Sequence, residues 1–591
     1  MDEQLRRYFA IESLAITPKR PSNDPEQRAV NILKESTTQL EDGHYQTGLL
    51  WKEQQTKMPN NYENAMKRLI TTEKKIDRDV ELRNKYKEQM KALVNKGYAE
   101  RAPLHRTENR TWYLPHFPVI NAMKPGKIRV VHDAAAKTKG VSLNDHLLTG
   151  PDLLQSLPGV IMRFRQHPVA VSADISEMFM QIKIKPEDRD ALRYLWRGDK
   201  RGNEKPTEYR MTSLIFGATS SPATSIYIKN FNAEKYRETE PEVYRAVIKN
   251  HYVDDYIQSF ETEQKAIDIA QRVRDVHREA RFELKQWTSN SKRLLTALNE
   301  TSEQKKSIDL HTENSSERVL GLNWNSDRDE LTFNLNLARL PHDIMNSERP
   351  TKRQVLKIVM SLFDPLGLAS PVTTKAKQLL QEIWRRGTGW DDEIDQDLAT
   401  QWNDWKSQLI NLKNEKIPRC YLRYTDATTL QLHTFVDASE TAYAAALYWR
   451  ATDSRGHVST SLIIAKSRVA PLKITSIPRL ELQAAVMGTK MATTVIEEHD
   501  RKPNTKFYWT DSKTVLTWLK NGARSYKPFV AHRIAAIEEN STLNEWRWVP
   551  TKQNVADDAT RNVPRNLDRW YNGPEFLQHE SNDWPTENLS F

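Results

Sequence analysis

The sequence of 591 residues contains a single cysteine, Cys420. One thiol cannot build an intramolecular disulfide framework, and it cannot supply the two or more thiolates of the common cysteine-containing zinc sites. We therefore expect that any metal ion bound by this chain is held by oxygen ligands.

Long hydrophobic runs are also absent. No stretch of 18 or more apolar residues occurs, 28% of the residues are charged, and the mean hydropathy is −0.73. Residues 1–14 alternate charged and apolar side chains and lack the continuous apolar segment of a secretory signal. These absences predict an intracellular protein without a membrane span.

The chain is long enough for several domains, since single hydrophobic cores rarely grow beyond about 250 residues. Its 88 Lys and Arg residues exceed its 78 Asp and Glu residues, which gives a net charge of +10. This surplus favours a polyanionic partner, but a soluble protein with excess lysine would show the same balance.

The residue pattern changes character along the chain. Residues 15–30 are rich in proline and charge, which predicts a linker or an extended arm. Residues 61–97 and 351–386 show helical spacing of apolar residues, with Thr351 as a candidate N-cap. Short alternating segments dominate between residues 110 and 260, among them 180–184, and predict the strands of an α+β domain.

The C-terminal part predicts a second mixed domain. Two strands within 430–449 and a third over 459–464 come first. A helix beginning at Pro478, a strand over 506–510 and another helix follow. This order favours a compact sheet with helices on its faces.

Two adjacent acids, Asp254 and Asp255, lie between apolar residues in the segment HYVDDYI at 251–257. The pattern predicts a tight β-hairpin bend, and adjacent carboxylates that are partly buried need a cation beside them. Asp174, at the end of a predicted strand, would complete an oxygen site for two Mg²⁺ ions, as in phosphoryl transfer. An ordinary Asp-Asp surface turn is the alternative.

These segments resemble reverse transcriptases, and the resemblance continues in further blocks. KPGKIRVVHD at 124–133 is similar to the fingers segment whose lysine and arginine grip the triphosphate of the incoming nucleotide. The resemblance implies this role for Arg129, and for Lys124 or Lys127 more weakly because the loop is shorter than in retroviruses. Cations there would offset phosphate charge in the transition state. A basic surface hairpin is the alternative.

Two aromatic residues fall in blocks of the same family. Phe179 stands five residues after Asp174, where the family has the aromatic that discriminates against ribonucleotides. A core aromatic is the alternative. FGATSSPA at 216–223 resembles the segment that supports template and nucleotide, but retroviral enzymes have glutamine near Phe216, which leaves the role of this residue open.

Two later blocks complete the series. ELKQW at 283–287 resembles the lysine-bearing block and implies a nucleotide contact for Lys285. VLGL at 319–322 resembles the hairpin that grips the primer and implies a primer contact for Gly321.

A second set of acids is formed by Asp437, Glu481, Asp511 and Asp557, each at or near the end of a predicted strand or helix. Four carboxylates that converge on one sheet edge would repel strongly without a metal. For each acid alone, a helix cap or a solvated turn is the alternative.

This set resembles the Asp, Glu, Asp, Asp group of the ribonuclease H fold, which implies cleavage of RNA in an RNA:DNA hybrid by metal-activated water. Asp557 fits better than Asp558, because Arg561 follows at the spacing of the family. Many relatives have a histidine in the preceding loop, which reads PTKQ at 550–553 here. Product release or metal handling is therefore expected to differ.

The linking region narrows the resemblance to the polyprotein of BEL/Pao long-terminal-repeat retrotransposons, from about Leu5 to Leu577. The segments that carry it are FDPLGLASPV at 363–372, EIW at 382–384, WDD at 390–392, GHYQ at 43–46, IPRLEL at 477–482 and WYNGP at 570–574.

The resemblance implies an α+β multidomain fold, in which a right-hand polymerase with fingers, palm and thumb precedes a helical connection and an α/β ribonuclease H-like domain. The expected divisions are an N-terminal helical and linker region at 1–95, fingers and palm at 96–335, thumb and connection at 336–415, the ribonuclease H-like domain at 416–575 and a tail at 576–591.

The leading hypothesis is a retrotransposon RNA-directed DNA polymerase with ribonuclease H activity and two Mg²⁺ ions per active site, with Mn²⁺ as the alternative metal. The implied partners are an RNA template, a DNA primer, the RNA:DNA hybrid and deoxynucleoside triphosphates, and no membrane. The rival hypothesis is a decayed or domesticated remnant that binds nucleic acid without catalysis. The presence of all seven acids favours activity.

The sequence lacks an Asp-Thr/Ser-Gly protease motif, a His-His-Cys-Cys zinc module and an integrase block. We therefore expect a piece of a longer polyprotein whose other products include protease and integrase, or a truncated genomic copy. The expected location is a cytoplasmic virus-like particle, with the nucleus as a second location.

Overall fold

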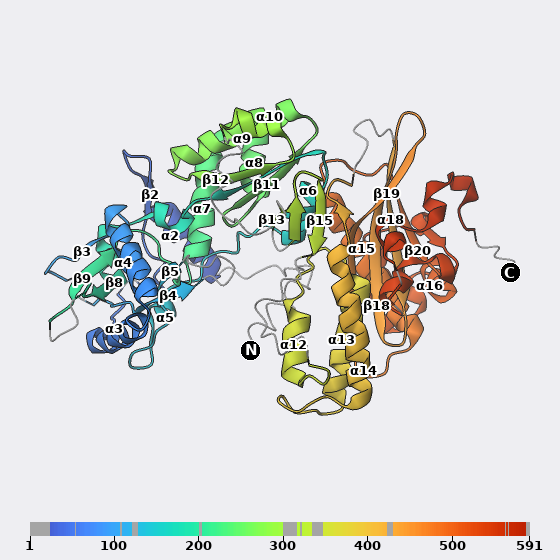
Figure 1. Cartoon of the computed structure of the whole chain (residues 1–591). Coiled ribbons are helices and arrows are strands. Elements are labelled where there is room, and N and C mark those ends of the chain that lie inside the picture. The colour runs from blue at the N-terminus through green and yellow to red at the C-terminus, as the bar shows by residue number, and fades with distance from the viewer. Residues whose placement is uncertain are drawn as a thin grey trace.

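The structure is a computed structural model in which two α+β halves lie side by side (Figure 1). It describes residues 24–53, 55–106, 109–120, 128–199, 204–299, 316–319, 322–333, 347–421, 429–561, 563–564 and 566–586, with only the backbone at 316–319. Three predicted site residues, Lys124, Lys127 and Gly321, lie outside these ranges. Within them, no helix is both long enough and apolar enough to span a membrane.

The palm sheet has the strand order β10-β11-β6-β12 and is antiparallel throughout. Its strands are β10 (His251–Tyr252), β11 (Asp255–Phe260), β6 (Val169–Ile175) and β12 (Leu284–Ser289). Helices α7 (Ser221–Ala233), α8 (Pro241–Lys249) and α9 (Glu263–Glu279) accompany it, and α9 packs on β6 and β11. Apolar side chains of the sheet and of α9 share one core, which holds the strand ends in place.

The fingers combine a three-stranded sheet, a hairpin and two helices. Their elements are β3 (Ala99–Arg101), β8 (Arg193–Trp196), β9 (Thr207–Met211), β4 (His116–Ile120), β5 (Ile128–His132), α3 (Tyr62–Ile76) and α4 (Val80–Asn95). The two helices confirm the prediction for residues 61–97.

Two local predictions were wrong. Residues 25–30 belong to α2 (Pro25–Ser36) and not to an extended arm, because the Asp24 side chain caps the helix at Glu26 N and Ala29 is buried. The strand expected over 180–184 is reduced to β7 (Lys183–Ile184). It is preceded by the 3₁₀ helix η1 (Met178–Gln181), which begins after Glu177 in the left-handed conformation.

The connection contains α12 (Lys352–Ser361), α13 (Ser370–Arg385) and α14 (Gln396–Asn411). Thr351 caps α12 as predicted, and its hydroxyl accepts a hydrogen bond from Gln354 N in a capping box. A small sheet of β13 (Ser316–Val319), β14 (Leu322–Asn325), β15 (Glu330–Phe333) and β16 (Ile417–Pro418) joins the two halves.

The C-terminal sheet has the order β19-β18-β17-β20-β21. Its elements are β17 (Thr429–Ala438), β18 (Ala442–Thr452), β19 (Val458–Val469), β20 (Thr505–Thr510), β21 (Trp546–Trp548), α15 (Ile477–Glu498), α16 (Lys513–Asn521) and α17 (Pro528–Glu538). Helix α15 lies so close to β17 that a Cβ at Gly488 would stand 2.6 Å from Val436 Cγ1. The predicted order of three strands, helix, strand and helix is confirmed.

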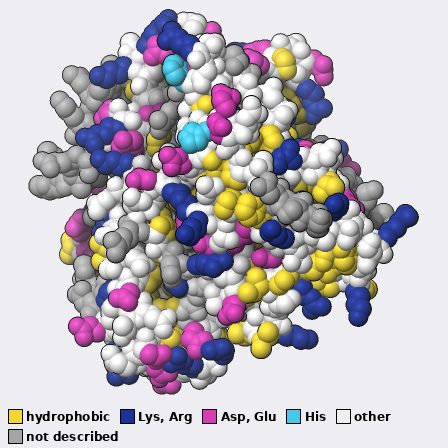
Figure 2. Space-filling model, turned by 90° about the vertical axis from the view of Figure 1, so that its right-hand side faces the viewer, with side chains coloured by type: hydrophobic (Ala, Val, Ile, Leu, Met, Phe, Trp, Pro, Cys, Tyr) yellow, Lys and Arg dark blue, Asp and Glu magenta, His cyan; other side chains and the backbone are white. Residues whose placement is uncertain are grey.

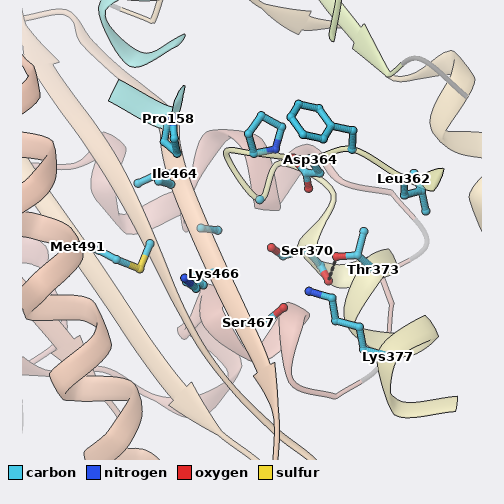
Figure 3. A pocket seen from close by; sticks show the side chains of 14 residues that line it. Pro158, Leu362, Asp364, Ser370, Thr373, Lys377, Ile464, Lys466, Ser467 and Met491 are labelled. Atoms are coloured by element: carbon cyan, nitrogen blue, oxygen red, sulfur yellow. Dashed lines mark hydrogen bonds between the residues drawn. The ribbon is translucent and has the colours of Figure 1, made fainter. Parts of the chain in front are cut away.

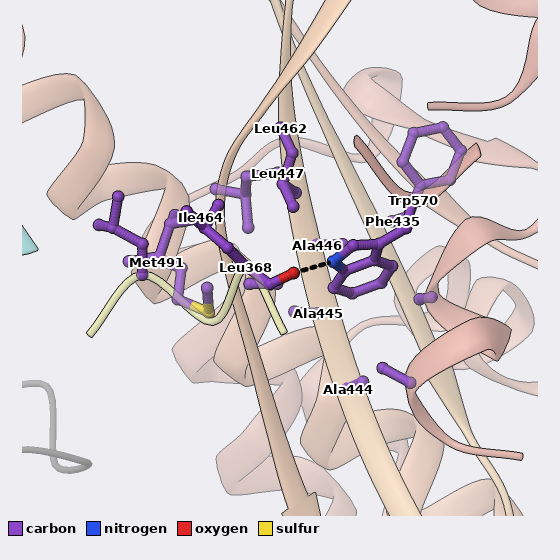
Figure 4. Packing of buried hydrophobic residues seen from close by; sticks show 14 of the residues in the cluster. Leu368, Phe435, Ala444, Ala445, Ala446, Leu447, Leu462, Ile464, Met491 and Trp570 are labelled. Carbon is purple, nitrogen blue, oxygen red and sulfur yellow. Dashed lines mark hydrogen bonds between the residues drawn. The ribbon is translucent and has the colours of Figure 1, made fainter. Parts of the chain in front are cut away.

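The loop between α12 and α13 is anchored in the core of this domain (Figure 4). Trp570 Nε1 donates a hydrogen bond of 2.9 Å to the Leu368 carbonyl, beside Phe435 and Leu447. The remaining α-helices and strands of the described residues are α5 (Leu143–His146), α6 (Leu157–Phe164), α10 (Lys292–Ala297), α18 (Asp568–Asn572), β1 (Thr38–Gln39) and β2 (Tyr45–Thr47).

Candidate active sites

The three palm acids come together at one end of the palm sheet. Asp174 lies near the end of β6 and pairs in register with Asp255 at the start of β11. Asp254 occupies the bend between β10 and β11, and its carbonyl accepts a hydrogen bond of 2.8 Å from Ile175 N. The bend predicted for residues 251–257 is therefore confirmed, and it folds back onto β6.

The backbone of this bend is strained. Val253 has a φ of +57°, a conformation that is costly for a β-branched residue. Such strain persists only where the surrounding structure imposes it, and it clusters at active sites. No residue pattern indicated this strain, because valine is an ordinary strand residue.

The palm acids have the geometry and charge of a ligand set for a divalent cation. One carboxylate oxygen from each of Asp174, Asp254 and Asp255 lies within 4.8 Å of the others. Among the described residues, no other group of three or more His, Cys, Asp or Glu meets this distance. Burial raises the pKa of the Asp254 carboxyl above its usual value, while the charge of Arg129 lowers it. A hard cation with oxygen ligands fits this cluster.

Arg129, Phe179 and Phe216 are brought into one row beside these acids. The Arg129 guanidinium lies 6.0 Å from the centre of the Phe216 ring, and the rings of Phe216 and Phe179 are 4.9 Å apart, centre to centre. Arg129 is exposed on β5, whereas both rings are half-buried. The row therefore has an exposed cation at one end and a half-buried aromatic ring at the other.

Lys285 is placed on the palm sheet but points to a local partner. It stands opposite Asp174 in the register of β12 and β6, and its Nζ lies 3.0 Å from Glu283 Oε2. The hairpin expected at 319–322 is formed by β13 and β14, with Val319 opposite Leu322. Its Gly321 lies outside the described residues.

The second set of acids surrounds the adjoining ends of β17 and β20. Asp437 on β17 is only 2% exposed and accepts a hydrogen bond from the Thr560 hydroxyl. Burial raises its pKa to about 7, and the charges of Asp511 and Asp557 contribute to the rise. Burial also raises the pKa of Glu481 on α15, with a further contribution from Asp511. The charge of Asp511 therefore acts on Asp437, Glu481 and Asp557, although no three of these four acids come within the 4.8 Å that joins the palm acids.

Asp557 lies in the 3₁₀ helix η10 (Val555–Ala559) and forms an ion pair with Arg561. Asp558 is directed elsewhere, with its Oδ2 lying 3.6 Å from Arg569 Nε. The preference for Asp557 over Asp558 as the fourth acid stays a prediction that this geometry favours.

Polar neighbours that the sequence reasoning missed connect these acids. Ser512 donates to Glu481, and the Thr551 hydroxyl donates to Asp511 Oδ2 at 2.7 Å. Asn554 is fully buried and donates to the Val436 carbonyl at 3.0 Å. Thr551 stands in the loop where many relatives have histidine. In the sequence, these three residues could have been found as polar residues next to a predicted acid or in the loop before one.

The surface around the C-terminal half carries charges of both signs. Figure 2 shows Lys and Arg side chains interspersed with Asp and Glu, and hydrophobic side chains also reach this face. The net charge of +10 is therefore not gathered into one continuous patch on the visible face.

Comparison with known proteins supports the resemblance. Residues 351–512 match the family model described as the Pao retrotransposon-like RNaseH-like domain. No curated protein matches the sequence significantly. Over the matched segment, the expected relationship to BEL/Pao elements is confirmed.

Two similar solved structures come from foamy virus. The protease-reverse transcriptase dRH in complex with double-stranded DNA shares 13% identity at a TM-score of 0.51, over 91% of this chain and 83% of that chain. The protease-reverse transcriptase in complex with an RNA/DNA hybrid shares 14% identity at a TM-score of 0.51, over 94% and 66%. These likenesses confirm the expected multidomain fold of a retroviral-type reverse transcriptase with a ribonuclease H-like domain.

Proposed function

We propose that this chain is an RNA-directed DNA polymerase with associated ribonuclease H activity from a BEL/Pao-type retroelement. The observation that carries the proposal is the convergence of Asp174, Asp254 and Asp255 within 4.8 Å at the end of the palm sheet. Three carboxylates this close have little use in a scaffold, because each adds repulsion to the folded state. They suit Mg²⁺ or Mn²⁺.

In the polymerase site, the three palm acids would hold two divalent ions, which when bound stabilise the attacking and leaving oxygens of phosphoryl transfer. Arg129 would bind the phosphates of a deoxynucleoside triphosphate. Its guanidinium is exposed, and its charge lowers the pKa of the Asp254 carboxyl. The Phe179 ring, backed by Phe216, would exclude a 2′-hydroxyl.

In the second site, Asp437, Glu481, Asp511 and Asp557 would hold the ions that activate water for cleavage of the RNA strand. The raised pKa values of Asp437, Glu481 and Asp557 support the assignment, because a bound cation would replace the protons that burial favours. The likeness to a foamy viral protein in complex with an RNA/DNA hybrid supports the same substrate class.

Primer extension on an RNA template tests the proposal. The purified chain with Mg²⁺ should extend a DNA primer with deoxynucleotides and shorten the labelled RNA. If a folded chain binds the hybrid but does neither with Mg²⁺ or Mn²⁺, the decayed or domesticated remnant is the correct reading. An active enzyme would justify a search for it in cytoplasmic particles and in the nucleus.

A further inference from the structure

Helix α6 precedes the palm strand β6, but its apolar side chains pack in the core of the C-terminal half. Val160 and Ile161 belong to the same buried cluster as Met491 of α15 and Ile464 of β19. Figure 3 shows Pro158 of α6 beside Ile464. The palm and the ribonuclease H-like domain therefore share a core at this helix.

Hydrogen bonds fix the end of α6 to the strand that enters the C-terminal domain. Arg165, 1% exposed, donates to the carbonyls of Arg419 at 3.1 Å and Leu462 at 3.2 Å. The Tyr421 hydroxyl donates to the Met162 carbonyl at 2.7 Å. These bonds are shielded from water, so relative movement of the two halves would leave buried polar groups unpaired.

A partly buried ion pair joins α6 to the end of α15. Arg163, 5% exposed, pairs with Glu498 and donates through Nε to Asn250 Oδ1 at 2.9 Å. A Cβ at Gly159 would stand 2.5 Å from the Glu498 carboxyl carbon. Because glycine has no Cβ, position 159 leaves room for the carboxylate of Glu498.

A second group lies beside it. Asp500 pairs with Arg245 of α8, and His167 Nε2 lies 3.8 Å from Asp500 Oδ2. The Asp500 amide donates to Gln166 Oε1 at 2.9 Å. Side chains from two separate palm segments thus converge on the residues that follow α15.

The two ion pairs connect elements that carry the two sets of acids. Helix α6 leads into β6, which carries Asp174, and α15 carries Glu481 near its start and Glu498 at its end. The stretch between Glu481 and Glu498 spans about 26 Å as a rigid helix. A rotation at its end would therefore displace Glu481.

We propose that Arg163, Arg245, Glu498 and Asp500, here called the domain joint, are positioning residues that hold the ribonuclease H-like acids at a fixed place relative to the palm acids. RNA is then cut at a fixed distance behind the primer terminus. This inference rests on the proposed function for its catalytic consequence, whereas the joint itself rests on the contacts alone.

Cut positions on a 5′-labelled RNA annealed to a chain-terminated DNA primer test the inference with the full-length chain. Asp500→Arg places a cation beside Arg245 and Arg163 and should spread the cuts over more positions. Arg245→Glu combined with Asp500→Arg should restore the narrow pattern. Gly159→Ala should also spread the cuts, because it displaces Glu498 without changing charge. Arg278→Glu, an exposed substitution on α9 outside the joint, is the control.

Hydrogen exchange on the same variants supplies a readout that does not depend on activity. Asp500→Arg should speed exchange in residues 157–167 and 495–501, and the double variant should reverse the effect. Unchanged exchange, or faster exchange with an unchanged cut pattern, would overturn the inference. If the wild type neither extends nor cuts, the proposed function fails, and unchanged exchange in the variants would reject the joint separately.

Discussion

Asp255 stands directly opposite Asp174 across the antiparallel pair of β11 and β6. Directly paired residues in such strands have Cα atoms about 4.5 to 5.5 Å apart, so the register alone brings two carboxylates from distant parts of the sequence together. The β10–β11 bend adds Asp254 through the bond from Ile175 N. A one-residue slip of β11 would separate the pair.

Asp254→Asn should abolish DNA synthesis or nearly so. The substitution keeps the size of the side chain but removes the charge that a divalent ion requires. Primer extension with Mg²⁺ measures the effect. Asp268→Asn, which changes an exposed acid on α9, is the matched control and should retain activity. Robust synthesis by Asp254→Asn would mean that the palm assignment is incorrect.

Phe179→Val should allow incorporation of ribonucleotides. Phe179 is half-buried against Phe216, so the smaller side chain opens space that the ring now fills. Competition between ribo- and deoxynucleotides in primer extension measures the selectivity. Phe231→Val alters another palm aromatic, on α7, and should leave selectivity unchanged. Unaltered discrimination in Phe179→Val would assign this residue to the core.

Arg129→Ala should raise the KM for deoxynucleotides and lower kcat, because the guanidinium is expected to contact the triphosphate in both the ground and transition states. Arg129→Lys should recover part of the loss, since it keeps the charge but not the bidentate geometry. Steady-state kinetics at saturating template provide the measurement. A change limited to template affinity would place Arg129 on the template path.

Glu481→Gln should abolish cleavage of RNA in a hybrid while primer extension stays near normal, and Asp254→Asn should do the converse. The two sets of acids are gathered around two separate sheets, so neither completes the ligand shell of the other. Both activities are measured on one 5′-labelled hybrid. Loss of both activities from either substitution, with the fold verified by circular dichroism, would contradict two separate sites.

Asp437 should make the stability of the metal-free protein depend on pH. Its pKa is raised to about 7 in the folded state, so the folded state favours the proton that the unfolded chain loses near pH 4. The contribution of Asp437 to stability is therefore present at low pH and is lost as pH rises toward 7.

Thermal unfolding in EDTA across this range measures the loss, and Asp437→Asn should flatten the dependence. Mg²⁺ should restore stability at pH 7 in the wild type but much less in the variant, because the metal replaces the proton. If the unfolding temperatures of both proteins depended on pH in the same way, ionisation of Asp437 would not destabilise the folded state.

The sequence by itself determined which side chains are available for chemistry and in what order they follow along the chain. The two acids of HYVDDYI predicted their hairpin, and the apolar spacing around α3, α4 and α12 predicted those helices, because local periodicity and capping act over a few residues. The prediction of a linker or extended arm at 15–30 was wrong in part. The burial of Ala29 and the cap from Asp24 outweighed a composition rich in proline and charge.

Only the tertiary structure decided how these parts face each other. Residues far apart in sequence meet in the row of Arg129, Phe216 and Phe179 and in the hydrogen bonds from Ser512 and Thr551. Arg163 is likewise buried by elements that are distant from it along the chain. No local pattern encodes such contacts, because they follow from the packing of whole elements. The pKa of Asp437 depends on that packing too, since desolvation and neighbouring charges exist only in the folded chain.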